Sequence, residues 1–273
     1  MSDTNHNEPL AEGSLISHLL ELRSRLVKAS LAIAIAFAPC AFFANKLFAL
    51  VAKPMVDQLP PGSKMISTSV VGSFMVPIKL ALICALVLAM PVILYQLWAF
   101  VAPGLYSKEK RFAVPLLVSS IVLFYVGVAF AYLLVFPLAF KFLITTTPGI
   151  AEYMPEIASF LDVATLLSLV FGLAFEIPVA TILLLWTGLV RITTLTQNRG
   201  YVLIGLAVFT ALVTPPDPIS MMAMLVPMYL LYELGLVAAR IMLKDKIAAQ
   251  ADQDRQEHAA SSPGEKSRGT SDE

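Results

Sequence analysis

The sequence predicts an all-α membrane protein with six transmembrane helices. The first observation is composition: the 273 residues are 58% hydrophobic and 14% charged, and the mean hydropathy is +0.79. A soluble domain normally carries about 25% charged residues on its surface. The second observation is distribution, because the apolar residues form six runs and the charged residues are confined to the chain ends and the gaps. We therefore expect the chain to cross a bilayer repeatedly.

The N-terminal part is expected to contain a short disordered start and a surface helix. Residues 1–13 are polar and acidic and show no periodicity. Ser14 is a plausible N-cap, and helical spacing in the following residues predicts an amphipathic helix on the membrane, with Leu15, Leu19, Leu22 and Leu26 on one face. The first apolar run follows at about residues 29–44. It also resembles the core of a cleaved signal peptide, but the long, acid-containing stretch before it favours a retained span.

Five further runs predict the remaining spans, at about residues 74–101, 112–136, 160–188, 201–213 and 219–236. The run at 201–213 would give a helix of about 20 Å, against a hydrocarbon layer of about 30 Å, which suits a thinned bilayer or shielding neighbours. The long connections at residues 45–73 and 141–159 are expected to be loops. Residues 241–273 are charged and predicted to be a disordered tail, which leaves 14–240 as the membrane domain.

The basic residues near the spans predict that both termini are cytoplasmic. If six spans alternate, eleven Lys and Arg residues fall on one side and four on the other. The four are Lys46, Lys53, Lys64 and Lys141, and Lys79 is left out because it lies within the second span and is expected to snorkel outward. Cytoplasmic loops carry the excess of basic residues. The two long loops are then expected outside.

Three acidic residues are the main candidates for function. Glu176 lies in the fourth span and is followed by Pro178; a carboxylate near the bilayer centre costs about 2.5 kcal/mol or more, so it is expected to face a polar interior, a cavity or a partner. Glu21 and Glu109 are acids in basic surroundings close to the same membrane face. Each either balances its neighbours or binds a partner's guanidinium groups through bidentate hydrogen bonds.

Other chemistry finds little support in the sequence. No nucleophile-and-base pair, phosphate-binding glycine loop or cluster of metal ligands is present, so we expect neither an enzyme nor a cofactor or metal. The formal net charge of zero gives no indication of nucleic-acid binding. Cys40 and Cys84 both fall within apolar runs and are expected to be buried thiols. Asp217, in the turn Thr214-Pro215-Pro216-Asp217-Pro218, is expected to be structural.

Four segments resemble the signature stretches of the TatC family, the multispanning subunit of the twin-arginine protein translocase. They are His18-Leu19-Leu20-Glu21-Leu22-Arg23-Ser24-Arg25-Leu26, Pro91-Val92-Ile93-Leu94-Tyr95-Gln96-Leu97-Trp98-Ala99-Phe100-Val101-Ala102-Pro103-Gly104-Leu105, Phe175-Glu176-Ile177-Pro178 and Leu212-Val213-Thr214-Pro215-Pro216-Asp217. The resemblance covers about residues 14–240 in order.

The resemblance implies a concave, glove-like bundle of six helices in the bacterial cytoplasmic (inner) membrane. It implies a receptor and core subunit that binds Arg-Arg signal peptides of folded proteins, forms homo-oligomers, and assembles with the single-span subunits TatA and TatB for export driven by the proton-motive force. The residues that match the signal-peptide surface are Glu21, Glu109, Arg23, Leu26, Phe100 and Tyr106. Glu176 and Pro178 match the intramembrane groove, and Pro54, Thr214, Pro215 and Asp217 match structural or partner-contacting positions. Met221 stands where the family can carry a polar amide.

The expected mechanism has two stages. Glu21 and Glu109 first bind the arginine pair, and the apolar core of the signal peptide then enters the groove beside Glu176. A proton-coupled small-molecule transporter, with Glu176 as the proton relay, is the alternative from another class, although no inverted repeat supports it. A structural membrane scaffold is the third interpretation.

Overall fold

The computed structural model of the chain describes residues 9–59, 63–101, 110–146, 154–213 and 218–244. Within these ranges the secondary structure is helical, apart from an isolated parallel β-bridge between Ile66 and Glu156. The chain divides into two compact units: Met1–Glu176 with Thr210–Met224, and Ile177–Phe209 with Leu225–Glu273.

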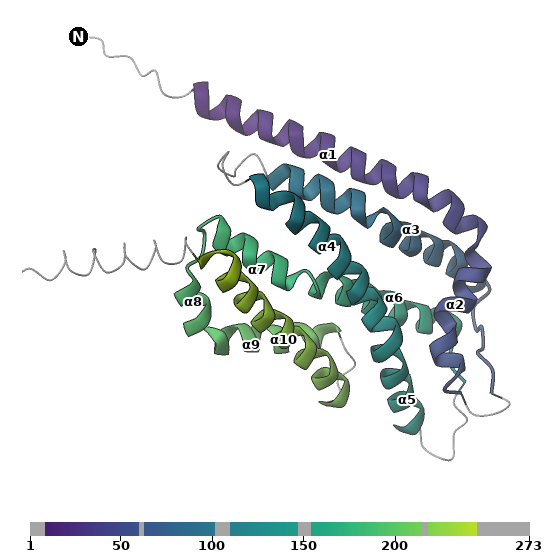
Figure 1. Ribbon diagram of the computed structural model, residues 1–273. Coiled ribbons are helices and arrows are strands. Elements are labelled where there is room, and N and C mark those ends of the chain that lie inside the picture. The colour runs from purple at the N-terminus through teal and green to yellow at the C-terminus, as the bar shows by residue number, and fades with distance from the viewer. Residues whose placement is uncertain (1–8, 60–62, 102–109, 147–153, 214–217, 245–273) are drawn as a thin grey trace, which may run out of the picture. The chain divides into compact units, whose positions relative to one another are not determined.

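The first unit contains the helices up to α6. They are α1 (Pro9–Phe42), α2 (Ala44–Val56), α3 (Val70–Val101), α4 (Lys110–Phe130), the π-helical turn η3 (Ala131–Val135), α5 (Phe136–Thr146) and α6 (Ile157–Ala174). Helix α3 is central, because it packs against α1, α2, α4 and α6, and it runs beside α1 in Figure 1. We call the end of this unit that carries the first turns of α1 the Glu21 end, and the opposite one the α2 end.

Helix α1 joins the predicted surface helix and the first span into one continuous helix of 34 residues. It begins at Pro9, earlier than the Ser14 cap predicted; proline suits the first helical position because the N–H that it lacks has no intrahelical partner there. Disorder was predicted for residues 1–13 and 241–273. Residues 9–13 and 241–242 are instead helical, and residues 1–8 and 245–273 lie outside the described residues. The chain turns at Phe43, whose backbone is not helical, and α2 begins at once.

The prediction that residues 45–73 form a loop was wrong over α2. Apolar side chains recur along this helix at helical spacing, at Leu47, Phe48, Val51 and Met55, and they give it an inner face. Its two lysines and its proline conceal this pattern in the sequence. Pro54, which matches a structural or partner-contacting position of the family, lies in the last turn of α2 and is buried.

The third span is longer than predicted, because helical structure continues from α4 through η3 and α5 to Thr146. The pair Phe136-Pro137 looked like an interfacial end. Pro137 instead lies inside this continuous helical stretch, just after the π-helical turn, where proline removes one backbone hydrogen bond. The predicted loop at 141–159 was therefore wrong for residues 141–146, and also for residues 157–159, which begin α6.

The fourth span is confirmed as two helices with a break between them. Helix α6 ends at Ala174, and the second unit begins with α7 (Ile177–Trp186). Pro178 cannot donate the hydrogen bond that Ala174 would accept in a continuous helix, which explains the break. Gly188 then stops α7 with a φ of +76°, a left-handed conformation that glycine adopts freely.

The second unit contains α7, α8 (Ile192–Gln197), and most of α9 (Arg199–Val213) and α10 (Pro218–Met242). Five helical stretches in the described parts of the chain are long and apolar enough to cross a membrane: Leu19–Phe42, Val70–Phe100, Ala113–Thr145, Ile157–Trp186 and Met221–Met242. Helix α9 is the short apolar helix between the last two of them. Together they account for the six predicted spans.

Glycines mark the closest helix crossings. In the first unit a Cβ atom at Gly127 of α4 would lie 2.4 Å from the carbonyl oxygen of Phe171, and one at Gly172 of α6 would lie 2.6 Å from the ring of Phe124. In the second unit a Cβ atom at Gly235 of α10 would lie 2.8 Å from the Cα atom of Pro178. Small residues at such crossings let membrane helices approach closely.

Candidate signal-peptide site and intramembrane carboxylate

Glu21 forms an ion pair one turn along α1, with Arg25. Both contacts go to one carboxylate oxygen: Nε of Arg25 lies 3.1 Å and Nη2 lies 2.5 Å from Oε1 of Glu21. The other oxygen, Oε2, has no partner among the residues that the structure describes. A carboxylate offers about four acceptor positions, so the pair with Arg25 leaves acceptor capacity on Glu21 for a second guanidinium.

A small apolar cavity of about 150 Å³ lies next to this pair, between α1 and α3. Its lining includes Leu26 and Ala29 from α1 and Leu97 and Phe100 from α3, and the side chain of Arg25 borders it. The structure therefore brings together Leu26 and Phe100, which the sequence places far apart. Arg23 is exposed on α1. Glu109 and Tyr106 lie outside the described residues.

Glu176 lies at the break after α6, where its backbone N–H donates to the carbonyl of Leu173 at 3.0 Å. Ser120, which is 1% exposed on α4, donates a hydrogen bond to Oε2 of Glu176. The second oxygen, Oε1, is buried and has no hydrogen-bond partner in the described part of the chain. The expectation that this carboxylate faces a polar group inside the protein is confirmed, and one acceptor atom remains available.

The other predicted site residues are divided between the units. Pro178, predicted beside Glu176, lies in the second unit and packs against Gly235 there. Met221 is partly buried and Ala211 is exposed, and both are apolar as the sequence shows. Thr214, Pro215 and Asp217 lie outside the described residues.

Sequence reasoning missed an ion pair between α3 and α6. The ammonium group of Lys79 contacts Oδ1 of Asp162, and the two side chains are 51% and 57% exposed within the protein. Lys79 was expected to snorkel, and no role was predicted for Asp162. The only signal in the sequence is one acid near the start of the fourth span and one base near the start of the second.

A second missed cluster lies within the second unit. Nη2 of Arg199, at the start of α9, lies 3.1 Å from Oε2 of Glu233 on α10, and the hydroxyl of Tyr229 donates to Oε1 of Glu233 at 3.1 Å. One turn away, the hydroxyl of Tyr232 donates to the carbonyl of Leu195 in α8 at 2.9 Å. These contacts tie the short α9 and its preceding turn to the last helix.

The segment after α2 is joined to the start of α6 at the α2 end. The N–H of Ile66 donates to the carbonyl of Pro155 at 3.0 Å, and the N–H of Ile157 donates to the carbonyl of Ile66 at 2.9 Å. Glu156 accepts hydrogen bonds from the hydroxyls of Thr68 and Ser159. These bonds, first the one from Thr68, hold the pKa of the Glu156 carboxyl below its usual value.

Comparison with known proteins decides the family. Residues 17–227 match the family described as Sec-independent protein translocase protein (TatC). The chain belongs to the TatC family. It is 48% identical over 226 residues to the TatC protein of Escherichia coli (strain K12), covering 83% of this chain and 88% of that protein. It is 47% identical over 236 residues to TatC of Azotobacter chroococcum mcd 1, covering 86% and 92%.

Solved TatC structures share the fold. The crystal structure of the twin-arginine translocase receptor TatC superposes with a TM-score of 0.73 at 34% identity, covering 82% of this chain and 98% of that chain. A second crystal structure of TatC, in the detergent DDM, gives the same TM-score at 33% identity. The six-helix TatC fold predicted from the sequence is therefore confirmed.

As a TatC-family member, the chain is a subunit of the Sec-independent protein translocase and a multi-pass protein of the inner membrane. Its role is protein transport. This assignment supersedes the small-molecule transporter that Glu176 alone would also permit. It also relates two sites on different helices, the Glu21 end of α1 and the break at Glu176, to the same role in protein transport.

Proposed function

We propose that this TatC-family chain is the receptor that binds Arg-Arg signal peptides of folded proteins at the Glu21 end of the bundle. The observation that carries the proposal is Oε2 of Glu21, which has no partner among the described residues, beside the cavity lined by Leu26 and Phe100. A guanidinium group needs a carboxylate acceptor, and the residues after the arginines of a signal peptide need an apolar surface. Both lie next to each other there.

The pair between Glu21 and Arg25 is weak enough to be exchanged. This pair is partly buried, and pairs four residues apart on a helix contribute about 0.3–0.5 kcal/mol, whereas a bidentate bond between a guanidinium and a carboxylate is stronger and more specific. An incoming arginine therefore bonds to Oε2, or displaces Arg25 altogether. In this proposal Arg25 keeps the carboxylate oriented until a peptide arrives.

Glu109 and Tyr106 complete the arginine-binding surface in this proposal. Glu109 directly precedes Lys110, the first residue of α4, and Tyr106 lies in the connection that leaves α3 just after Phe100. A second carboxylate allows each arginine of the pair its own acceptor. Arg23, exposed on α1, repels a peptide that carries extra cations elsewhere and so favours one register.

The second stage of the proposal uses Glu176. The apolar core of the signal peptide enters the bundle beside the α6 break, where Oε1 of Glu176 accepts a hydrogen bond from the peptide backbone or from a helix of a partner. Pro178 shapes the groove by keeping α6 and α7 as separate helices.

The remaining parts of the proposal concern assembly. TatA and TatB are the single-span partners, the chain forms homo-oligomers in the complex, and the proton-motive force drives export. Both termini are cytoplasmic, since the Glu21 end then carries the excess of basic residues. Pro54, Thr214, Pro215 and Asp217 support the fold or contact partners. The chain binds and conducts proteins without catalysing a reaction on them.

Site-specific photocrosslinking tests the proposal. A photoreactive amino acid at position 21, 109 or 176 of the full chain, assembled with TatA and TatB, is expected to crosslink a folded precursor carrying an Arg-Arg signal peptide. The same group at position 156, at the α2 end, is the control and should give no such product. Glu109→Ala should abolish the crosslink from position 21 while the protein remains inserted. An unchanged crosslink in Glu109→Ala, or an equal one from position 156, contradicts the assignment.

A further inference from the structure

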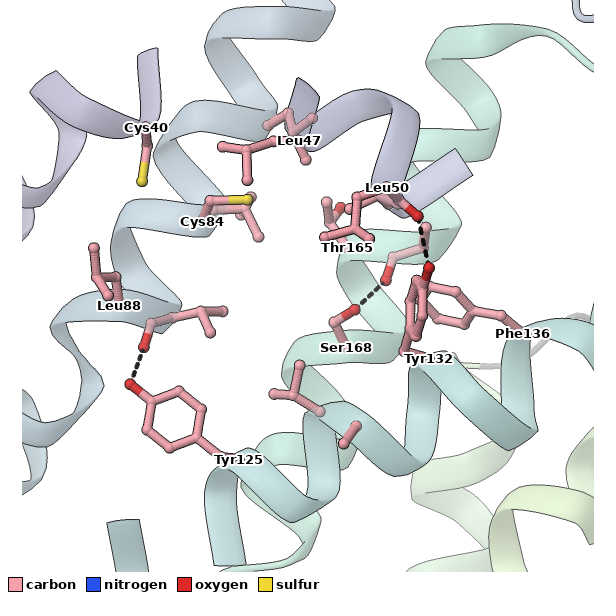
Figure 2. Close-up of a pocket in the computed structure, with 17 residues that line it drawn as sticks. Cys40, Leu47, Leu50, Cys84, Leu88, Tyr125, Tyr132, Phe136, Thr165 and Ser168 are labelled. Carbon is pink, nitrogen blue, oxygen red and sulfur yellow. Dashed lines mark hydrogen bonds between the residues drawn. The ribbon is translucent and has the colours of Figure 1, made fainter. Parts of the chain in front are cut away.

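The signal-peptide role leaves an apolar cavity in the first unit unexplained. It has a volume of about 470 Å³ and is lined by side chains from α1, α2, α3, α4, η3, α5 and α6 (Figure 2). Neither Glu176 nor Ser120 lines it. The cavity is therefore distinct from the intramembrane carboxylate, and its volume lies within the range of about 300–1,000 Å³ typical of ligand sites.

The hydroxyl groups at the cavity wall are already satisfied by the protein backbone. Tyr125 donates to the carbonyl of Val87 at 3.1 Å, and Tyr132 donates to the carbonyl of Leu50 at 2.8 Å, as Figure 2 shows. The hydroxyls of Thr165 and Ser168 donate to carbonyls four residues earlier in α6, at 2.8 Å each. No wall hydroxyl needs a ligand acceptor, so the chemistry of the wall suits a hydrocarbon.

The cavity runs along the helices from the α2 end toward the middle of the spans. On α3 its lining extends from Leu80 to Leu88, which is about 12 Å of helix. Half of a hydrocarbon layer of about 30 Å is about 15 Å, so the cavity is nearly as deep as one leaflet. Leu50, Leu88 and Ala129 are lining residues that are also exposed, so the cavity opens at the protein surface, which lipid covers at this depth.

Positive charge lies on α2, the helix that lines one end of the cavity. Helix α2 contributes Leu47, Leu50 and Val51 to the wall, and it carries Lys46 and Lys53, both exposed and two helical turns apart. The ammonium group of Lys46 lies 5.5 Å from the ring centre of Phe43, which keeps it at the corner between α1 and α2. Basic groups at this position attract anionic lipid headgroups.

We propose that this cavity holds one acyl chain of an anionic glycerophospholipid from the leaflet at the α2 end, with Lys46 and Lys53 binding its phosphate. The depth of the cavity is close to that of one leaflet, and the hydroxyl groups of its wall already have hydrogen-bond partners. The two lysines of α2 carry the charge that complements a phosphate. The lipid fills the space between α2, α3 and α6, and so supports the packing of the amphipathic α2 on the bundle. This role goes beyond signal-peptide binding and does not depend on it.

The test uses the full chain in phospholipid nanodiscs that contain phosphatidylglycerol with a photoactivatable group in the middle of one acyl chain. Crosslinks mapped by mass spectrometry are expected to concentrate on Leu80–Leu88 and on the facing turn of α6. Ala129→Trp, which fills the opening, should lower these crosslinks severalfold. Ala34→Trp, the same change at an exposed α1 position outside the cavity, is the matched control and should leave them unchanged.

The headgroup part of the proposal has its own variants. Lys46→Gln with Lys53→Gln should lower the yield with the phosphatidylglycerol probe relative to a phosphatidylcholine probe by at least about fivefold. Lys64→Gln, a loss of charge in the segment after α2, should leave the ratio unchanged. Equal yields from both probes in the wild-type chain overturn the headgroup assignment, and crosslinks spread evenly over all lipid-exposed faces overturn the acyl-chain site.

The native thiols provide a second measurement if Ala129→Trp does not fold. The two cysteines of the sequence, Cys40 and Cys84, both line the cavity. Adding phosphatidylglycerol to delipidated wild-type protein in detergent should slow their reaction with an apolar maleimide severalfold, and an unchanged rate counts against the proposal. If a photoreactive signal peptide labels the cavity and displaces the lipid probe, the cavity belongs to the peptide groove and the lipid assignment is wrong.

Discussion

Ser120 on α4 donates a hydrogen bond to Oε2 of Glu176 at the end of α6, while Oε1 of the same carboxylate is buried without a partner among the described residues. The two residues are 56 positions apart in the sequence, and the bond joins two membrane helices at the point where the fourth span breaks. The serine thus offsets part of the cost of placing a carboxylate inside the bundle, and one acceptor atom is left without a donor in the described part of the chain.

Removing this hydroxyl should destabilise the protein. In Ser120→Ala both carboxylate oxygens of Glu176 lack a donor in the described part of the chain, and the cost expected for such a group is about 1–3 kcal/mol. A lower thermal unfolding midpoint of the purified protein is the readout. Ser119→Ala is the matched control, since its hydroxyl donates at 2.8 Å to the carbonyl of Leu116 in its own helix. Equal effects of Ser120→Ala and Ser119→Ala would contradict the stabilising role of the Ser120 hydroxyl.

The pair between Lys79 and Asp162 should behave as a coupled unit. In Asp162→Asn the ammonium group of Lys79 loses its partner near the α2 end, so this single change should destabilise more than the double change to Lys79→Met and Asp162→Leu. Unfolding midpoints of wild type, both single variants and the double variant measure the coupling. Additive effects would mean that lipid headgroups or water solvate both groups and that the pair contributes little.

Close helix packing predicts a contrast between two glycines. Gly127→Ala would place a Cβ atom 2.4 Å from the carbonyl oxygen of Phe171, so α4 and α6 must separate, and overpacking of this kind costs about 1–3 kcal/mol. Gly205→Ala on α9 meets nothing within 4 Å, and should be neutral or stabilising because alanine favours helix. Resistance to detergent unfolding distinguishes the two. A Gly127→Ala protein as stable as wild type would mean that this crossing is looser than described.

The contact at the α2 end should weaken in acid. Hydrogen bonds from Thr68 and Ser159 lower the pKa of Glu156 below its usual value of 4.5, so the ionised form is favoured in the folded state. The stability from these bonds is present above pH 4.5 and is lost as the pH falls through the lower, folded-state pKa. Thr68→Val should move the pKa of Glu156 upward, measured by NMR titration of a labelled glutamate. Ser67→Ala is the control, and a shift of the same size there would contradict the assignment.

Arg25 should act as a competitor for the signal peptide. Its pair with Glu21 is worth about 0.3–0.5 kcal/mol, so Arg25→Gln should tighten binding of an Arg-Arg peptide about twofold. Lys28→Gln removes the same charge from an exposed position on α1 and serves as the control. Fluorescence anisotropy with a labelled signal peptide gives both affinities. Weaker binding in Arg25→Gln would mean that Arg25 orients Glu21 more than it competes for it.

Local signals predicted the parts of the fold that depend on single residues. Pro178 marks the break in the fourth span, because proline lacks a hydrogen-bond donor wherever it occurs. Gly188 marks the end of that span, because glycine tolerates a left-handed backbone. Helix α2 was missed because its inner face consists of a few apolar residues among lysines and prolines. The helical pattern was present, but the signals for turns outweighed it.

Contacts between helices were harder to predict. Helix α3 is apolar on all sides, so periodicity cannot tell which face meets α1 and which meets α6, and the packing of Leu26 near Phe100 is not readable from it. The partners Lys79 and Asp162 are 83 residues apart, and many other pairings of single charges would satisfy the sequence equally well. The three acidic candidates came from their charge and position in the sequence, the other site residues came from resemblance to a family, and the packing around them came from the structure.

The π-helical turn η3 shifts the buried face of the third span by one residue. From α4 to the last residue of this turn, buried positions follow ordinary helical spacing, from Leu116 through Phe124 and Ala131 to Val135. After it, burial restarts one residue later, at Phe136, and continues at Phe140. Deleting one residue, such as the exposed Leu133, would keep a helix but turn α5 by about 100° relative to α4. The aromatic side chains that now pack inside would then face lipid. Even a one-residue change in the length of this span would therefore disrupt its packing.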